Sequence, residues 1–319
     1  MKTFSNTTSF KIKEPCIVTI GKFDGEHAGH KKIFSVMREE AIKIGLKLAV
    51  FTFVNPPSFI VENLGGNLQI TTNEERRKKF IEEGVDYLVE YPFTKETSRL
   101  EAMTFVKDIL ISKMNMKAIV AGIDCAFGYN KSGNIALLNQ MKKEYDFEVV
   151  VVEKVKYKND LEISSSLIRD LISEGEIKDA NRLLESVYSI TGTVVVGNKL
   201  GRELGFPTVN IYPPIEKITP KYGVYATKVE VKSEGKTYYG ISNIGTNPSV
   251  KTDSKNHRER VETWIFGFDK EIYGKEIEVF FYEYIREQKT FESLEKLKEQ
   301  IKIDKEKVAK FWKIPCTDK

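Results

Sequence analysis

The order of predicted strands and helices changes once along this chain, near residue 185, and this change limits the folds that the chain can adopt. Before it, β-rich runs alternate with amphipathic helical stretches, which is typical of a parallel α/β sheet. After it, short strands follow one another through turns that contain Gly and Pro, which favours an antiparallel barrel or sandwich. We therefore predict two domains, residues 1–185 and 186–319. The strands expected in the first domain are 16–21, 47–53, 86–91, 117–122 and 147–153.

Helical spacing is clearest in two places. Apolar residues recur at i, i+3, i+4, i+7 and i+8 over 102–110, which predicts a helix with one buried face. The stretch 293–312 also has helical spacing, with charged outer faces, and we expect it to pack against the barrel. The segment 164–184 is interpreted as two short helices that end the first domain.

The charge and cysteine content argue against several classes of protein. The 319 residues include 50 Lys and Arg against 46 Asp and Glu, a net charge of +4, which is too mild to indicate a nucleic-acid or membrane partner but is compatible with a small anionic ligand. The three cysteines have no C-x-x-C spacing, so no disulfide framework is indicated. No apolar run approaches the ~20 residues that span a bilayer, and the N-terminus lacks a signal core. We expect a cytoplasmic protein.

The segment GKFDGEHAGH (21–30) joins a predicted strand to a predicted helix and holds two of the three histidines. In a parallel sheet such a turn presents free backbone N–H groups of a helix N-terminus to a ligand. Its glycines allow close approach to phosphate, and His27 and His30 lie about one helical turn apart, so that both can donate to one phosphate chain. This arrangement suits attack on the α-phosphate of a nucleotide. Zinc is a weaker interpretation, because only His257 and scattered cysteines remain to complete a site.

A run of serines precedes a helix in ISSSLIRD (163–170). Ser164 or Ser165 can simply cap that helix. With Arg169 one turn inside the helix, the same N-terminus can also form a second phosphate cradle. Both interpretations remain open for the segment taken alone.

The segment GNKLGRELGFPTVNI (197–211) combines a glycine-containing loop with a strand that carries Thr208 and Asn210. Glycines beside a Thr hydroxyl and an Asn carbonyl can wrap nucleotide phosphates and hold Mg²⁺ through oxygen ligands. The alternative is an ordinary barrel turn, which the sequence PTVN after so many loop glycines makes the weaker interpretation.

The first half resembles the adenylyltransferase module of the bacterial bifunctional riboflavin kinase/FAD synthetases. The resemblance is carried by GKFDGEHAGH, ISSSLIR, TTNEERRKKFIEEGVD (71–86) and GIDCAFGYNKSG (122–133). It implies a nucleotidyltransferase-like fold that transfers AMP from ATP to FMN, with His27 and His30 as catalytic residues. The ATP-binding residues that it implies are Gly21, Phe23, Asp24, Gly25, His27, His30, Ser164, Ser165 and Arg169. The FMN-binding residues are Phe53, Pro57, Asp124 and Phe127.

The second half resembles the riboflavin kinase module of the same family, through 197–211 and also through 243–250, 262–281 and 285–297. The match implies that Glu262 is the catalytic base, because a ribityl 5′-hydroxyl is a poor nucleophile that needs a carboxylate to accept its proton. The implied ATP-binding residues are Gly197, Lys199, Gly201, Gly205, Pro207, Thr208 and Asn210, with Thr208 and Asn210 also binding Mg²⁺. The implied flavin-binding residues are Arg286 and Phe291.

The chain departs from the family pattern at several positions. Val54–Asn55–Pro56–Pro57 stands where the family usually has an acid and a second imidazole after the second strand. The other departures are Lys22, Cys125, Lys131, Ser166 and Gly267. We therefore expect an intact kinase and a weaker adenylyltransferase, or one with altered metal dependence.

The predicted function is that of a bifunctional enzyme that uses ATP and Mg²⁺ to convert riboflavin to FMN and FMN to FAD. Three alternatives remain. The chain could be a riboflavin kinase with weak or lost FAD synthesis, or a single-activity adenylyl- or cytidylyltransferase, which would leave 197–211 without a purpose. It could also be a flavin-binding regulator, although an RNA partner would favour a basic aromatic surface.

Overall fold

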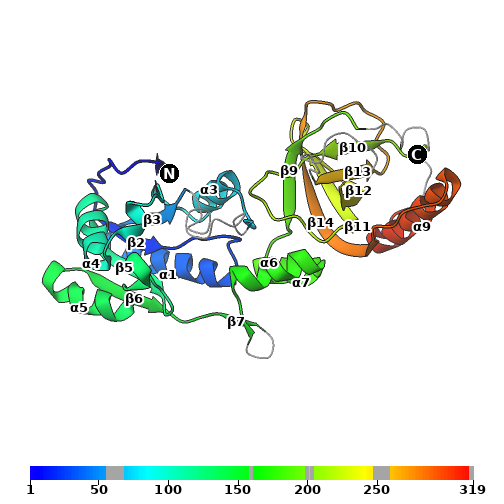
Figure 1. The fold of residues 1–319 in the computed structure, drawn as a ribbon. Coiled ribbons are helices and arrows are strands. Elements are labelled where there is room, and N and C mark those ends of the chain that lie inside the picture. The colour runs from blue at the N-terminus through cyan, green and yellow to red at the C-terminus, as the bar shows by residue number, and fades with distance from the viewer. Residues whose placement is uncertain (55–67, 158–160, 198–200, 202–204, 247–258, 316–319) are drawn as a thin grey trace. The chain divides into compact units, whose positions relative to one another are not determined.

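A computed structural model describes residues 1–54, 68–157, 161–197, 201, 205–246 and 259–315 of the chain (Figure 1). It divides into two compact units, Met1–Ser165 and Ser166–Lys319. The second unit begins before the predicted boundary at 185, because helix α7 (Ile177–Leu184) packs against strand β14 (Glu276–Glu287). Asn181 of α7 also donates to Phe281 O at 2.8 Å.

The first unit contains a six-stranded parallel sheet in the order β1-β4-β3-β2-β5-β6. The five predicted strands are confirmed, and β1 is added at the edge because its backbone pairs with β4 although its sequence is short and polar. The strands are β1 (Lys2–Ser5), β2 (Cys16–Ile20), β3 (Lys47–Phe53), β4 (Tyr87–Tyr91), β5 (Met116–Gly122) and β6 (Glu148–Val152).

Helices cover both faces of this sheet (Figure 1). Alternate strand residues enter two separate cores: Ile17 and Val50 pack with Phe34 and Phe80, whereas Val18 lies in the opposite core. The helical elements are α1 (Ala28–Ile44), α3 (Asn73–Glu82), η1 (Thr97–Arg99), α4 (Ala102–Thr104), η2 (Phe105–Lys113), η3 (Tyr129–Lys131) and α5 (Ile135–Tyr145). A small hairpin, β7 (Lys156–Tyr157) and β8 (Leu161–Glu162), follows the sheet.

Strand order reverses at β2, which has β3 on one side and β5 on the other. In open α/β sheets the crevice outside the carboxyl ends of the strands at such a switch point is where ligands bind. The loop that follows β2 is the one that contains His27. The fold therefore places the predicted nucleotide loop at the expected edge of the sheet.

The second unit contains a curled antiparallel sheet in the order β10-β13-β12-β11-β14-β9. Its strands are β9 (Ser189–Thr193), β10 (Thr208–Ile211), β11 (Gly223–Val231), β12 (Lys236–Gly245), β13 (Arg260–Ile265) and β14. Val195, just after β9, forms a bridge with Asn210 of β10, so the two ends of the sheet approach each other. The predicted antiparallel, barrel-like architecture is confirmed.

The helices described after the first sheet are α6 (Ser165–Glu174), α7 and α9 (Leu294–Trp312). Helix α9 packs against β11, β12 and β14, as predicted. Its last residue, Trp312, packs on Tyr239 and Tyr282 with ring centroids 4.8 Å from each. Lys228 lies over the Trp312 ring at 5.1 Å, so a cation–π contact adds to the docking of the helix.

Candidate active sites

The loop between β2 and α1 has an unusual backbone. Phe23, Gly25 and Glu26 all have positive φ, at 50°, 80° and 27°. A Cβ at Gly25 would lie 2.8 Å from Ile70 Cδ1, so both the backbone conformation and the space require glycine there. Non-glycine residues in strained conformations persist where the surroundings fix them, and they cluster at functional sites.

Asp24 fixes this loop from inside. Its Oδ1 accepts from Ile70 N at 2.8 Å, from Thr71 N at 3.0 Å and from the Thr71 hydroxyl at 3.3 Å. The Ser165 hydroxyl donates to Asp24 O at 2.7 Å. The buried Asp24 carboxylate therefore binds neighbouring backbone, and it would support a nucleotide site by shaping the loop.

His27 and His30 lie together as the sequence predicts. Their rings stack with centroids 3.8 Å apart and planes 21° apart, and the His30 ring also packs on Phe23 at 5.1 Å. The Nδ1 atoms of both are buried without a hydrogen-bond partner among the described residues. Burial lowers the pKa of His27 to about 4, and burial also lowers the pKa of His30, with smaller contributions from the charges of His27 and Lys79. Both imidazoles are therefore neutral near pH 7, and each offers one N–H donor and one acceptor.

Positive charge near this loop includes the N-terminus of α1, Lys79, which pairs with Glu26 at 3.3 Å, and Arg76, which was not predicted from the sequence. Arg76 is buried on α3 and donates to Lys22 O at 2.9 Å and to Phe53 O at 3.2 Å. It thereby joins the ends of β2 and β3. The only sequence signal for this role is an arginine four residues before Phe80 on the buried side of a helix.

Arg169 belongs to the second unit, where it donates to the Ser166 hydroxyl at 3.2 Å. Its role in holding the ATP triphosphate stays a prediction. Ser164 and Ser165 end the first unit.

The second candidate site lies on one face of the curled sheet. Asn210 of β10 and Asn243 of β12 flank Glu262 of β13 directly on either side, and Thr208 lies opposite Trp264. Residues directly opposite each other in neighbouring strands point to the same face, so Thr208, Asn210 and Glu262 are brought together.

Asn210 has the features of a ligand-binding side chain. It is 3% exposed, and its Oδ1 has no hydrogen-bond partner among the described residues. A Cβ at Gly197 would lie 2.4 Å from Asn210 Nδ2, so the loop glycine leaves the space that this amide occupies. An unpaired, buried carbonyl oxygen beside a carboxylate is a suitable hard ligand for Mg²⁺.

A cavity of about 330 Å³ opens beside Thr208 within the second unit. Its wall combines apolar and polar surface, with charged residues at the side formed by 269–271. The lining residues are Val194, Pro207, Thr208, Val209, Ile265, Phe268, Asp269, Lys270, Glu271, Ile272 and Tyr273. Such a cavity suits a flat heterocycle whose polar end reaches Thr208.

Two protein-family models match the chain: FAD synthetase over residues 9–167 and riboflavin kinase over residues 184–312. The bifunctional riboflavin kinase/FMN adenylyltransferase of Buchnera aphidicola subsp. Schizaphis graminum is 38% identical to it, over 95% of this chain and 96% of the relative. This chain belongs to the bifunctional riboflavin kinase/FMN adenylyltransferase family. The Escherichia coli K12 member is 32% identical over 94% of each chain.

A solved structure also matches across the whole family fold. A crystal structure described as a macrolide-efflux protein from Streptococcus pneumoniae has a TM-score of 0.86 and 32% identity, over 96% of this chain and 97% of that one. The predicted family and fold class are thus confirmed. The roles of individual residues stay predictions.

The residues predicted to bind FMN in the adenylyltransferase unit have differing surroundings. Phe53 is half-buried at the end of β3 and packs against Phe93 at 4.9 Å, whereas Phe127 is buried against Phe105 at 5.7 Å. Asp124 is exposed and pairs with Lys154 at 3.3 Å. Pro57, with Asn55 and Pro56, lies outside the described residues.

Among the residues predicted to bind ATP in the first unit, Phe23 is part of the core and packs on Phe34 at 5.4 Å and on Phe80 at 5.6 Å. A Cβ at Gly21 would lie 3.0 Å from the Phe23 ring. The absence of a side chain at Gly21 therefore leaves room for the Phe23 ring in the core beneath the loop.

In the kinase unit, Arg286 is held by Asp304 of α9. Its Nε donates to both carboxylate oxygens at 2.9 Å and its Nη2 donates to Oδ2 at 2.7 Å, while Phe291 lies 5.9 Å from the guanidinium carbon. The Arg286–Asp304 pair joins α9 to β14. The prediction that Arg286 and Phe291 bind flavin stays a prediction.

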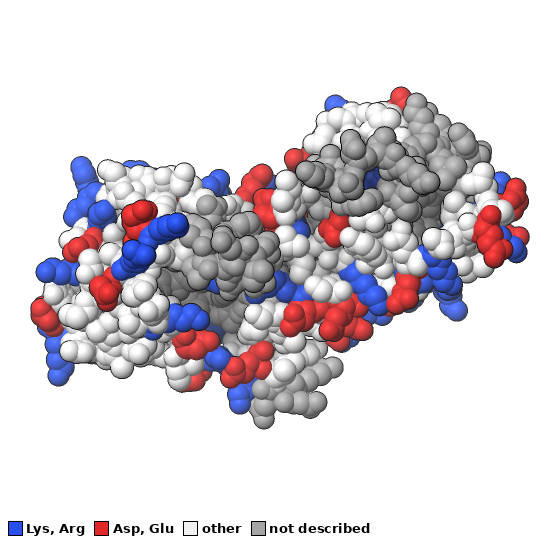
Figure 2. All heavy atoms as spheres, in the orientation of Figure 1, with Lys and Arg blue, Asp and Glu red and all other residues white. Residues whose placement is uncertain are grey.

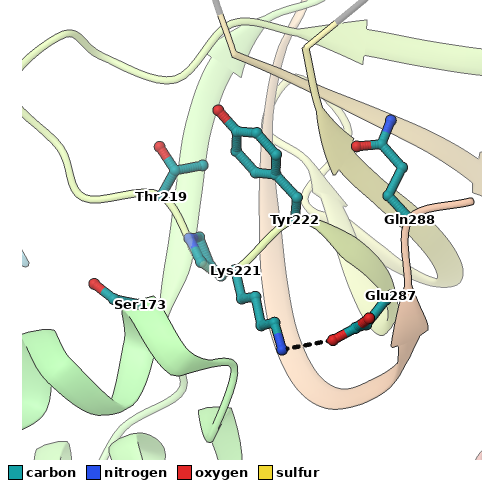
Figure 3. Close-up of a pocket in the computed structure, with 7 residues that line it drawn as sticks. Ser173, Thr219, Lys221, Tyr222, Glu287 and Gln288 are labelled. Atoms are coloured by element: carbon teal, nitrogen blue, oxygen red, sulfur yellow. Dashed lines mark hydrogen bonds and ion pairs between the residues drawn. The ribbon is translucent and has the colours of Figure 1, made fainter.

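A second, larger cavity, of about 570 Å³, lies near the carboxyl end of β14 (Figure 3). Figure 3 shows Lys221 meeting Glu287, with Nζ and Oε1 2.9 Å apart. The cavity is lined by Ser173, Thr219, Pro220, Lys221, Tyr222, Glu287 and Gln288. Glu287 and Gln288 directly follow Arg286 in the chain.

The remaining kinase-loop residues are partly described. Gly205 has a φ of 85°, and a Cβ at Gly201 would lie 2.4 Å from Phe206 O, so both positions favour glycine. Lys199 and His257 lie outside the described residues.

Among the described residues, no group of three or more His, Cys, Asp or Glu side chains is placed to hold a metal ion. None of the described helices is long and apolar enough to cross a bilayer. On the face shown in Figure 2, Lys and Arg are interspersed with Asp and Glu.

Proposed function

We propose that the second unit phosphorylates riboflavin to FMN with Mg-ATP and that the first unit transfers AMP from ATP to FMN, releasing pyrophosphate and FAD. One observation carries the proposal: each unit holds its own constellation of site residues. Glu262 lies directly opposite Asn210 in one unit, and the His27–His30 stack lies at the N-terminus of α1 in the other. The family models that match the two halves support the same division.

In the kinase unit, Glu262 accepts the proton of the riboflavin 5′-hydroxyl as that oxygen attacks the γ-phosphorus of ATP and ADP leaves. The Thr208 hydroxyl and Asn210 Oδ1 would hold Mg²⁺, which when bound neutralises charge on the phosphates. The unpaired Asn210 oxygen fits this role. The cavity beside Thr208 would take the adenine, because Thr208 lies at its edge and apolar side chains such as Ile265 and Phe268 line part of its wall.

In the adenylyltransferase unit, an oxygen of the FMN phosphate attacks the α-phosphorus of ATP directly, and the bond to pyrophosphate breaks. No covalent enzyme intermediate is needed. Neutral His27 and His30 donate N–H groups to the phosphates, and the α1 N-terminus supports the negative charge that develops. Ser164, Ser165 and Arg169 are proposed to hold the same triphosphate, with Phe53 and Phe127 toward the flavin.

The substituted segment Val54–Pro57 leads us to propose that adenylylation is the slower activity, or that its metal dependence is altered. An FMN adenylylation rate that equals or exceeds the riboflavin phosphorylation rate in one preparation would contradict this. We also infer a cytoplasmic location, where ATP and riboflavin are available and where the thiols of Cys16 and Cys125 would stay reduced.

The proposed function is tested by incubating the protein with riboflavin, ATP and Mg²⁺ and following FMN and FAD by chromatography. Glu262→Gln should abolish FMN formation, a loss of at least about 10²-fold for a general base, yet leave FAD formation from supplied FMN. His27→Ala combined with His30→Ala should do the reverse. A folded Glu262→Gln protein that lacks both activities would show that the division of labour is wrong.

A further inference from the structure

The strand that carries Glu262 also carries a buried cation. Arg260 and Glu262 are two residues apart on β13, so their side chains leave the same face of the sheet. Arg260 Nη2 forms an ion pair with Glu262 Oε1. The Arg260 side chain is 9% exposed, whereas that of Glu262 is 34% exposed.

The neighbours of Arg260 explain why it turns toward Glu262. Its cross-strand partner on β12 is Gly245, which has no side chain to pair with. The space where a Gly245 Cβ would lie is taken by the amide of Gln288, whose Oε1 is 2.6 Å from that position. A buried guanidinium needs an acceptor, and the carboxylate two residues along the same strand supplies one.

The ion pair makes the two carboxylate oxygens of Glu262 inequivalent. Oε1 is held by the guanidinium, which restricts rotation of the carboxylate plane, while the partial exposure of the side chain leaves the other oxygen for a ligand. Asn210 and Asn243 fix the positions on either side of Glu262 in the sheet. The group that accepts a proton is thus oriented before substrate arrives, and preorganised geometry of this kind is a large part of catalysis.

Resting on the proposed function, we propose that Arg260 is a positioning residue of the riboflavin kinase reaction, which holds Glu262 Oε1 so that Oε2 faces the riboflavin 5′-hydroxyl. In the step itself the O–H proton passes to Oε2, the 5′-oxygen bonds to the γ-phosphorus, and the bond from that phosphorus to the ADP oxygen breaks. Arg260 exchanges no atom in this step.

Arg260→Gln tests the proposal. It should lower kcat for riboflavin phosphorylation by about 10²-fold, as expected when a catalytic group loses its orientation, with little change in KM for riboflavin or Mg-ATP. Arg182→Gln is the matched control, since it removes an exposed, ion-paired arginine from α7 and should leave kcat unchanged. A wild-type kcat in Arg260→Gln would overturn the proposal.

A double-mutant cycle separates positioning from an independent role. Because Arg260 acts through Glu262, Arg260→Gln should cause no further loss in a Glu262→Gln background. An equal loss in both backgrounds would overturn the proposal. If Glu262→Gln alone keeps a wild-type kcat, Glu262 is not the base and the proposed function of the kinase unit is wrong in that respect. If Glu262→Gln loses activity but Arg260→Gln keeps a wild-type kcat, only the positioning role of Arg260 is wrong.

Folding is checked in the same samples. Trp264 and Trp312 are the only tryptophans of the chain, and both belong to the second unit, so their fluorescence in urea reports on that unit. If Arg260→Gln does not fold, Arg260→Lys replaces it as the test. Lysine keeps the positive charge but lacks the planar guanidinium, so this variant should have an intermediate kcat at unchanged KM. A wild-type kcat with a raised KM would show that position 260 binds substrate, and would overturn the proposal.

Discussion

His27 is an imidazole that folding removes from water without giving it a charged partner. Its pKa therefore falls to about 4 in the folded chain, against an ordinary value of 6.5. Between these two values the unfolded chain binds a proton that the folded chain does not. The contribution of neutral His27 to the free energy of unfolding is therefore fully present above about pH 6.5. It is lost progressively as the pH falls toward about 4.

This sign gives a prediction for His27→Gln. On going from about pH 7 to about pH 5, the first unit of the wild type should lose about 2 kcal/mol more stability than that of the variant, since the slope is about 1.4 kcal/mol per pH unit below 6.5. Urea unfolding followed by far-UV circular dichroism measures the difference, with tryptophan fluorescence reporting the second unit separately. Equal losses in both proteins would contradict the burial of a neutral His27.

Gly197→Ala tests the proposed role of Asn210. The added methyl would lie 2.4 Å from Asn210 Nδ2, so the amide would have to leave its present position beside Glu262. We expect riboflavin phosphorylation to fall by at least about 10-fold, as for other misplaced site groups, while FMN adenylylation is unchanged. Gly235→Ala is a control in the same unit: nothing lies within 4 Å of the added methyl, so it meets no side chain, although the positive φ of Gly235 adds a backbone cost that Gly197→Ala does not have. Unchanged kinase activity in Gly197→Ala would argue against Asn210 as a ligand.

For individual residues, the sequence predicted which side chains belong to the sites better than it predicted which residues those side chains contact. Thr208, Asn210 and Glu262 were identified by their motifs, but their direct opposition depends on strand register. Asp24 binds backbone, which no motif indicates. Arg76 and Arg260 were not predicted, because each makes its contacts through its place in the fold and not through a local pattern.

At the scale of elements, α3 is a short helix whose start is well specified. Thr72 accepts from Glu75 N at 3.2 Å, and the Glu75 carboxylate accepts from Thr72 N at 2.9 Å, forming a capping box. This helix carries Arg76, which joins the ends of β2 and β3. The cap therefore supports the adenylyltransferase site.

Thr72→Ala should cost about 1 kcal/mol of stability in the first unit and reduce FAD formation more than FMN formation. Ser293→Ala is the counterpart in the second unit, because Ser293 caps α9 by accepting from Lys296 N at 3.3 Å. It should affect FMN formation instead. The two activities measured on both variants check this, with FAD formation measured from supplied FMN. An equal or larger loss of FMN formation in Thr72→Ala would contradict it.

The predicted helix over 102–110 shows what periodicity can and cannot indicate. Its buried face is confirmed at Phe105, Val106, Ile109 and Leu110. The backbone over Phe105–Lys113, however, is a π-helix and not an α-helix. Both types bury a similar set of residues over two turns, so apolar spacing does not distinguish them. The edge strand β1 was missed because backbone pairing, and not apolar content, defines it.

At the scale of the whole molecule, the two proposed activities belong to separate compact units. A protein with Glu262→Gln and a protein with His27→Ala and His30→Ala should therefore together convert riboflavin to FAD, although neither does so alone. The second protein makes FMN, which diffuses to the first.

FAD measured by chromatography in the mixture and in each protein alone checks this prediction. The rate should rise with the concentration of free FMN. If the mixture accumulates FMN but makes no FAD, although the Glu262→Gln protein uses supplied FMN, the FMN does not leave the unit that makes it.

The hydrogen bond from Ser165 to Asp24 O has a practical consequence for separating these activities. The last residue of the first unit is fastened to the loop that carries the histidines, so the chain leaves that unit at its proposed nucleotide site. A gene divided before Ser165 would leave this loop without one of its supports, at a cost of about 1 kcal/mol. A fragment that keeps the complete proposed nucleotide site would therefore extend past Ser165 and through Arg169 of α6.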